Sequence, residues 1–307
     1  MKLGFGTSQL GGQTIFAKKQ VGMGPQKKSD SLKAIKKALI NGINFFDTAD
    51  IYGNGKVEKI LGETLSSKRN VVICTKYGNR FYNKKYLFDI SSNYLIESVE
   101  NSLKRLRKTY IDILLLHSPP NNILMTKNYI STLNHLKEKN KIKTFGISCK
   151  SIESAKNFIN KYDFIDYIEI IYNICDRRAE NTLFKICSKK NIKIIARIPL
   201  VSGFLSLQNL NKKYRNDDSR KYVDKDFKEW IKKFHLKSKF LSQHSNNMIS
   251  NALRFCFTNK SISVVIPGMR NVKQVNCNYK SFIKGPLSAK MVKKISKLPK
   301  FYPGWNV

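Results

Sequence analysis

The chain has 307 residues, of which 41% are hydrophobic and 11% aromatic, so it can bury a sizeable core. No run approaches the ~20 consecutive apolar residues of a membrane-spanning helix, and the N-terminus lacks the pattern of a signal peptide, so we expect a cytoplasmic protein without a membrane segment. Lys and Arg total 57 against 21 acids, a net charge of +36, but they are spread over all predicted helices and loops, which argues against nucleic acid as a partner.

Short β-branched runs alternate with amphipathic segments along the chain. The eight runs that we expect to form strands are Lys2–Thr7, Ile43–Thr48, Asn70–Tyr77, Ile111–Ser118, Ile142–Cys149, Ile165–Asn173, Ile192–Pro199 and Ser261–Gly268. We expect the first helix to begin at Ser29 or Asp30, which are good N-cap residues, and to end near Gly42. Further helical faces run from Val57 to Leu65 and from Leu95 to Leu106.

Eight strand–helix units fit a closed parallel barrel, whose usual length is about 250 residues plus insertions. An open doubly wound sheet would place a GxGxxG phosphate loop directly after its first strand. The glycines at positions 4, 6, 11 and 12 do not have that spacing. We therefore predict an α/β fold with a single domain, a (β/α)8 TIM barrel over residues 1–307.

One segment interrupts the alternation. From Val201 to about Asp226 the chain is polar and rich in Lys and Asn, and it follows the seventh expected strand. Long loops inside a compact domain are usually functional or disordered. Because the loops after strands 7 and 8 of such barrels commonly form a phosphate site, we expect an extended loop with that role here.

Four polar residues follow the ends of expected strands. Asp47, Lys76 and His117 each close an apolar run, and Tyr52 comes five residues after Asp47. In a barrel, the carboxyl ends of the strands meet at one mouth, where catalytic groups lie. We therefore expect these four side chains to converge there.

Their chemistry is complementary. Asp47 can pair with Lys76, and the ammonium can lower the pKa of the Tyr52 phenol from its reference value of about 10. His117 can hydrogen-bond a carbonyl oxygen and orient it. The assembly suits protonation of an oxygen on which negative charge develops.

The second reactant must come from outside the chain. No Ser-His-Asp order is evident, and the six cysteines include no CxxC pair and no His at metal-ligand spacing, so we expect no metal. A hydride from a nicotinamide cofactor, transferred to a small carbonyl substrate, is the economical solution.

Several blocks of the sequence, in order, resemble the aldo-keto reductase superfamily over nearly the whole chain. They are FFDTADIYGNGKVEKILGE, TKYG, LLLHSP, FGISC, IIYN, PLVSGFL and IPGMRN. The resemblance implies reduction of an aldehyde or ketone, possibly sugar-derived, with NAD(P)H. It makes Tyr52 the general acid, Lys76 and Asp47 the pair that tunes it, and His117 the residue that orients the carbonyl.

The resemblance also implies residues that bind the cofactor. Ser148 contacts the nicotinamide carboxamide, and Tyr172 stacks on the nicotinamide ring. Pro199, Leu200, Gly203 and Leu205 line the pyrophosphate, while Gly268, Arg270, Gln274 and Asn278 surround the adenosine end. Arg270 and the Lys-rich loop favour the 2′-phosphate of NADP, with NAD as the other possibility.

The chain departs from the family pattern at three positions. Glu169 stands among the cofactor-binding residues where a Gln is common, Cys149 where an Asn is frequent, and Cys277 where an acid is frequent. Two alternatives to carbonyl reduction stay open. One is an NAD(P)-dependent sugar or alcohol dehydrogenase that uses the same four residues in reverse, and the other is a cofactor-binding regulatory subunit with little turnover.

Overall fold

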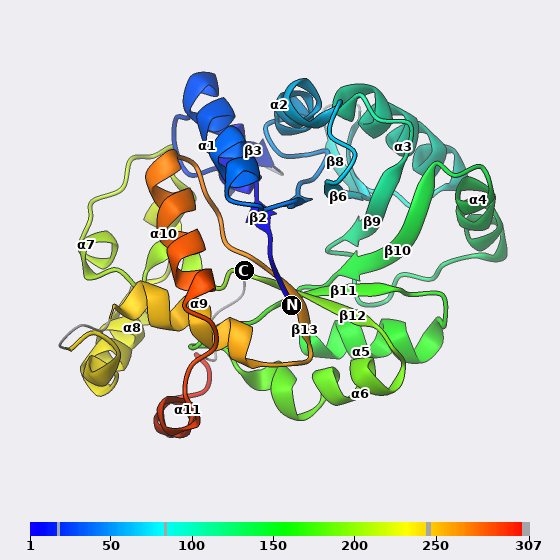
Figure 1. The fold of residues 1–307 in the computed structure, drawn as a ribbon. Coiled ribbons are helices and arrows are strands. Elements are labelled where there is room, and N and C mark those ends of the chain that lie inside the picture. The colour runs from blue at the N-terminus through cyan, green and yellow to red at the C-terminus, as the bar shows by residue number, and fades with distance from the viewer. Residues whose placement is uncertain (17–18, 83–84, 244–246, 303–307) are drawn as a thin grey trace.

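The computed structural model describes residues 1–16, 19–82, 85–243 and 247–302, and its strands form a barrel inside a ring of helices (Figure 1). Nine parallel strand segments follow the order β1-β13-β12-β11-β10-β9-β6-β5-β2. Their bounds are β1 (Lys2–Leu3), β2 (Phe5–Gly6), β5 (Phe45–Asp47), β6 (Val72–Tyr77), β9 (Ile111–His117), β10 (Ile142–Ser148), β11 (Tyr167–Ile171), β12 (Lys193–Arg197) and β13 (Ile262–Ile266). Every predicted strand range contains an observed strand.

The first predicted strand closes the barrel, because its two halves have different neighbours. β1 pairs with β13, and β2 pairs with β5. Gly4 lies between the halves and donates its N–H to the oxygen of Val265 at 2.8 Å. A Cβ at Gly4 would come within 2.9 Å of both Ile266 and Phe45, so the close approach requires glycine. Counted as one strand, β1 and β2 complete the eight of the predicted (β/α)8 barrel, which is confirmed.

The helices cover the outside of the barrel (Figure 1). They are α1 (Lys28–Ile40), α2 (Lys56–Leu65), α3 (Ser92–Leu106), α4 (Lys127–Glu138), α5 (Ile152–Lys161), α6 (Leu183–Lys189), α7 (Leu207–Leu210), α8 (Lys225–Lys237), α9 (Met248–Thr258), α10 (Val272–Ile283) and α11 (Ala289–Ser296). The two predicted apolar faces are buried in α2 and α3. Within the described ranges, no helix has the length and apolar character to cross a membrane.

The start of α1 differs from the prediction. The helix begins at Lys28 with Lys27 as N-cap, so Ser29 and Asp30 lie in its first turn instead of capping it. An acid in the first turn is still favourable, because the helix dipole places partial positive charge there. The prediction for the other end is confirmed: Gly42 follows the helix in the left-handed conformation, with φ of 77°.

Two hairpins and one long segment extend the carboxyl ends of the strands. β3 (Ile15–Phe16) pairs with β4 (Lys19–Gln20) in the connection from β2 to α1, and β7 (Asn79–Tyr82) pairs with β8 (Lys85–Phe88) after β6. The segment from Val201 to Asp226 contains two 3-10 turns, Val201–Gly203 and Ser219–Tyr222, with the short helix α7 between them. It therefore has local structure, and α8 already begins at Lys225.

Candidate active site

At the carboxyl ends of the strands, the inward-facing positions change from apolar to polar. Alternate residues of a strand point to the same side. Asp47, Lys76 and His117 each come two residues after an apolar residue of the barrel interior. His117 on β9 lies opposite Ser148 on β10, which lies opposite Glu169 on β11. These five residues form a polar row above the apolar interior.

Lys76 lies between two carboxylates of this polar row. Its Nζ forms an ion pair with Asp47 Oδ1, lies 3.2 Å from Glu169 Oε2 and donates to the oxygen of Thr48 at 3.0 Å. All three charged side chains are at least 95% buried. Burial lowers the pKa of Lys76, but the two carboxylates outweigh it, and the net pKa is raised well above its usual value. The expected Lys76–Asp47 pair is confirmed, and the contact with Glu169 is an addition.

Tyr52 lies in the turn after β5 and faces His117. The two rings meet edge to face, with centroids 5.9 Å apart and an interplanar angle of 86°. Lys76 Nζ lies 5.5 Å from the centroid of the Tyr52 ring. The structure therefore brings together the four residues that the strand ends predicted, at one mouth of the barrel.

The net pKa of Tyr52 is raised, although Lys76 lowers it as we expected. Burial raises the pKa of the phenol, Lys76 lowers it, and Asp47 and Glu169 raise it, so that the net pKa lies well above 10.0. The predicted effect of Lys76 is therefore present, but the exclusion of water from the phenol and the two carboxylates beside Lys76 outweigh it. A phenol that keeps its proton can act as a proton donor at neutral pH.

His117 is neutral in this environment. Burial lowers its pKa well below 6.5, and the charges of Lys76, Arg197 and Lys150 lower it further. Its Nδ1 is buried and has no hydrogen-bond partner among the residues that the structure describes. A neutral imidazole carries one N–H, which is available to a ligand oxygen that enters between His117 and Tyr52.

Ser148 and Glu169 form a hydrogen-bonded pair in the polar row. Ser148 Oγ donates to Glu169 Oε1 at 2.9 Å. Glu169 Oε2 faces Lys76 and has no hydrogen bond to any residue in the described ranges. Both side chains are almost fully buried. The pair thus connects Ser148, which is expected to contact the nicotinamide carboxamide, to Lys76, whose ammonium lies near the Tyr52 ring.

Tyr172 lies apart from the polar row. It directly follows β11, three residues after Glu169, so continued strand alternation directs it to the side opposite Glu169. Its ring packs against Phe184 and Phe255, its hydroxyl donates to Glu180 Oε1 at 2.5 Å, and it is only 1% exposed. We therefore correct the expectation that Tyr172 stacks on a cofactor, because neither face of the ring opens to the mouth.

The residues expected at the pyrophosphate follow β12 on one turn. They are Pro199, Leu200, Gly203 and Leu205. Gly203 has φ of 91°, a left-handed conformation that favours glycine, and its oxygen accepts from Asn209 Nδ2 at 3.1 Å. The first residues of the predicted loop are therefore held in a fixed turn beside the mouth.

The residues expected at the adenosine end lie between β13 and the first turns of α10. They are Gly268, Arg270, Gln274 and Asn278. The backbone N–H of Arg270 donates to Gln274 Oε1 at 2.8 Å, so these two residues are in direct contact. The Arg270 guanidinium donates to Gln26 Oε1 at 2.8 Å and to the oxygen of Met23 at 2.7 Å. Arg270 therefore holds the connection between β2 and α1, a contact that the sequence did not indicate.

Arg197 is a residue of the mouth that the sequence reasoning missed. It is the last residue of β12, two positions after Ile195, which faces the barrel interior. Its charge lowers the pKa values of both Tyr52 and His117. The alternation in KIIAR, which directs Ile195 and Arg197 to one side, is the signal that would have found it.

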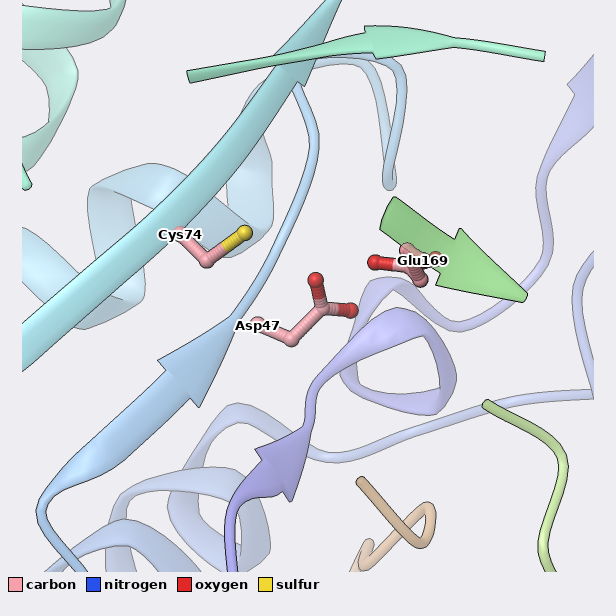
Figure 2. A group of neighbouring side chains, drawn as sticks. All are labelled: Asp47, Cys74 and Glu169. Atoms are coloured by element: carbon pink, nitrogen blue, oxygen red, sulfur yellow. The ribbon is translucent and has the colours of Figure 1, made fainter. Parts of the chain in front are cut away.

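Three side chains near the mouth have metal-ligand chemistry. Ligand atoms of Asp47, Cys74 and Glu169 all lie within 4.8 Å of one another, and Figure 2 shows them turned toward a common space. The ammonium of Lys76 already contacts both carboxylates. Burial raises the pKa of the Cys74 thiol well above its usual value, which disfavours the thiolate that a metal binds. These three side chains are therefore better suited to binding the Lys76 ammonium than to binding a metal ion.

A cavity of about 1050 Å³ lies beside the mouth, between the connection from β2 to α1 and the segment after β12. It is lined by Gln13, Ile15, Gln20, Arg215, Asn216, Asp217 and Tyr222. Both walls leave the carboxyl ends of strands, so the cavity is on the same end of the barrel as the polar row. None of the predicted site residues lines it.

The fold and the polar row define a (β/α)8-barrel enzyme with its site at the carboxyl ends of the strands. The sequence model described as "Aldo/keto reductase family" matches residues 2–300, and the chain belongs to that family. Membership in this family makes it an oxidoreductase that depends on a nicotinamide cofactor.

Similar proteins agree with this assignment. The chain is 28% identical over 257 residues to "Uncharacterized oxidoreductase YqkF" of Bacillus subtilis, covering 82% of each chain. It is 28% identical over 286 residues to "L-galactose dehydrogenase" of Arabidopsis thaliana, covering 90% of this chain and 82% of that one. Among solved structures, the aldo-keto reductase AKR11C1 of Bacillus halodurans, in its holo form, superposes with a TM-score of 0.80 at 26% identity, over 99% of this chain and 94% of that chain.

Proposed function

We propose that the protein reduces an aldehyde or ketone to an alcohol, with Tyr52 as the general acid. A nicotinamide cofactor, when bound, supplies a hydride to the carbonyl carbon. The observation that carries the proposal is the convergence of a protonated phenol and a neutral imidazole beside the buried ammonium of Lys76.

Each of these residues has a separate role in the proposed reaction. The N–H of His117 orients the carbonyl oxygen by a hydrogen bond, and the Tyr52 hydroxyl donates its proton to that oxygen as negative charge develops. Lys76 stabilises the phenolate that remains. Asp47 and Glu169 keep Lys76 charged and in place, since each contacts its Nζ.

The residues of the mouth fit a nicotinamide dinucleotide. Ser148 and Glu169 would hold the carboxamide, whose N–H₂ group suits the carboxylate oxygen that has no hydrogen bond. Pro199, Leu200, Gly203 and Leu205 would hold the diphosphate, and Gly268, Arg270, Gln274 and Asn278 the adenosine end. NADP is preferred to NAD in this proposal because the segment after β12 is rich in Lys, whose positive charge suits the 2′-phosphate.

A second candidate is the reverse reaction, oxidation of a sugar or alcohol. It is favoured by the name of one relative, the L-galactose dehydrogenase. The same groups serve both directions, with the Tyr52 phenolate accepting the proton. Neither direction requires a metal in this proposal.

The first test is a titration of intrinsic fluorescence with NADPH and NADH, followed by a panel of aldehydes and ketones and, with the oxidised cofactors, of alcohols and sugars. We expect saturable binding and faster turnover in the reducing direction, with NADPH preferred. Faster oxidation would favour the dehydrogenase. Cofactor binding with negligible turnover across both panels would favour a regulatory subunit, and no binding of either cofactor would contradict the proposal.

A further inference from the structure

Arg197 presents an uncompensated positive charge at the mouth of the barrel. Its Nε is buried and has no hydrogen-bond partner within the described part of the chain, where the guanidinium makes one hydrogen bond, from Nη2 to the oxygen of Cys149 at a long 3.3 Å. Among the residues that the structure describes, no carboxylate lies within 4.0 Å of its guanidinium. Because arginine stays charged in proteins, a buried N–H of this group without a partner is unfavourable.

The other shielded cations of the molecule have partners. Lys76 has two carboxylates, Arg105 pairs with Glu58, and Arg220 pairs with Asp218. The buried Arg177 donates to backbone oxygens, at 2.7 Å and 2.8 Å in its two shortest bonds. Arg197 thus differs from these four cations, because its Nε–H has no acceptor among the described residues.

The place of Arg197 points to the reacting position. It ends β12 two residues after Ile195, which faces the barrel interior, and its Nη2 donates to the oxygen of Cys149, the residue that follows Ser148 of the polar row. From there its charge acts on both Tyr52 and His117, between which the carbonyl oxygen would lie. Lys150, an exposed residue that follows β10, adds positive charge on the His117 side. The charge of Lys76 is offset by its carboxylates, so the field of Arg197 and Lys150 would favour an anion next to the carbonyl.

We propose that Arg197 is a substrate-binding residue that recognises a carboxylate or phosphate group carried by the carbonyl substrate. The planar guanidinium matches either anion with two parallel hydrogen bonds. This inference rests on the proposed carbonyl reduction and specifies its substrate class. The diphosphate of the cofactor is the other source of the same chemistry, and the experiment separates the two.

The experiment compares pairs of aldehydes of which one member carries an anionic group and the other does not. The kcat/KM values of 4-oxobutanoate and butanal, and of glyceraldehyde 3-phosphate and glyceraldehyde, are measured for the wild type and for Arg197→Met, Arg197→Lys and Arg215→Met. Arg215 is the matched control, because its side chain is 77% exposed and pairs with Asp217 on the same end of the barrel. Thermal unfolding of each variant verifies that it is folded.

In the wild type we expect at least one anionic substrate to be preferred to its neutral partner by roughly 10- to 100-fold. Arg197→Met should bring that ratio close to one, Arg197→Lys should keep part of it, and Arg215→Met should keep all of it. The inference would be overturned if the ratio of the kcat/KM values, anionic over neutral substrate, were unchanged in Arg197→Met, or if the wild type did not prefer the anionic substrates. Weaker binding of NADPH to Arg197→Met with an unchanged ratio would assign Arg197 to the cofactor diphosphate instead.

A binding measurement keeps the inference separate from the proposed function. The protein is first saturated with NADP⁺ and then titrated calorimetrically with succinate or with butanoate. The two acids have four carbons each and differ in one carboxylate, and their dissociation constants are compared. We expect the wild type to prefer succinate and Arg197→Met to lose the preference. If no carbonyl is turned over, the proposed reaction fails, while this ratio still supports or refutes an anion site at Arg197.

Discussion

The polar row and the loops around it are held together by different forces. In the row, Asp47 and Glu169 are buried carboxylates that both contact the buried ammonium of Lys76, and the three residues come from three strands. In the loops, the connection from β2 to α1 is joined to the segment after β12 by single hydrogen bonds, such as Gly24 N–H to Asp217 O and Ser219 N–H to Gly22 O, both at 2.9 Å. The row should therefore control chemistry and stability, and the loops should control affinity.

Removal of Lys76 should have the largest effect on the polar row. Lys76→Met leaves two buried carboxylates facing each other without a cation, and breaking a buried pair in this way costs about 3–5 kcal/mol. We expect a loss of that size in the free energy of unfolding, measured by urea denaturation at neutral pH, together with loss of turnover.

The double variant Lys76→Met with Glu169→Gln is the control, because it removes one of the two unpaired charges. It should recover about 0.5–3 kcal/mol of the loss, as residues in contact couple by amounts of this order. Strictly additive effects would mean that Glu169 does not share Lys76 with Asp47.

Substitution of Arg270 tests the loops. Its guanidinium donates to Met23 O and Gln26 Oε1 and thereby holds the connection from β2 to α1. Arg270→Met should raise the dissociation constants of NADPH and NADH alike, by roughly 10-fold for the loss of the three hydrogen bonds to Met23, Pro25 and Gln26, with kcat little changed. Fluorescence titration measures both, and weakening confined to NADPH would instead place the 2′-phosphate on Arg270.

The pH dependence of reduction should show the smallest effect. Burial and the nearby cations hold the pKa of His117 below 6.5, so it becomes protonated only below that pH, and the pKa of Tyr52 lies above 10.0, so it loses its proton only above that pH. We expect kcat/KM to be flat between pH 6.5 and 10.0. An inflection inside this range that disappears in Tyr52→Phe or His117→Gln would show that the row is more hydrated than its burial indicates.

The sequence was sufficient for those features that depend on strand periodicity. Apolar runs ending in Asp47, Lys76 and His117 predict strands and their carboxyl ends, and a parallel barrel brings these ends together. The eight strands and the Lys76–Asp47 pair followed from that reasoning. Alternation could also have separated Glu169 from Tyr172, since residues three apart on a strand face opposite sides.

Other features depend on three-dimensional surroundings that periodicity does not contain. The pKa of Tyr52 is raised chiefly by burial, and further by Asp47 and by Glu169, which is 117 residues away in the sequence, so its direction could not be read from Lys76 alone. The contacts of Arg270 with Met23 and Gln26 join residues more than 240 positions apart. The start of α1 was missed because Lys27 caps it without a side-chain hydrogen bond.

The most direct test of the account is the turnover of Tyr52→Phe with NADPH and a carbonyl substrate of the wild type. The control is Tyr110→Phe, at the residue immediately before β9 and therefore at the opposite end of the barrel. We predict that kcat falls by about 100- to 10,000-fold in Tyr52→Phe, while the dissociation constant of NADPH stays within about twofold and Tyr110→Phe behaves as the wild type. A Tyr52→Phe protein that turns over at nearly the wild-type rate would contradict the central claim that the Tyr52 hydroxyl is the proton donor.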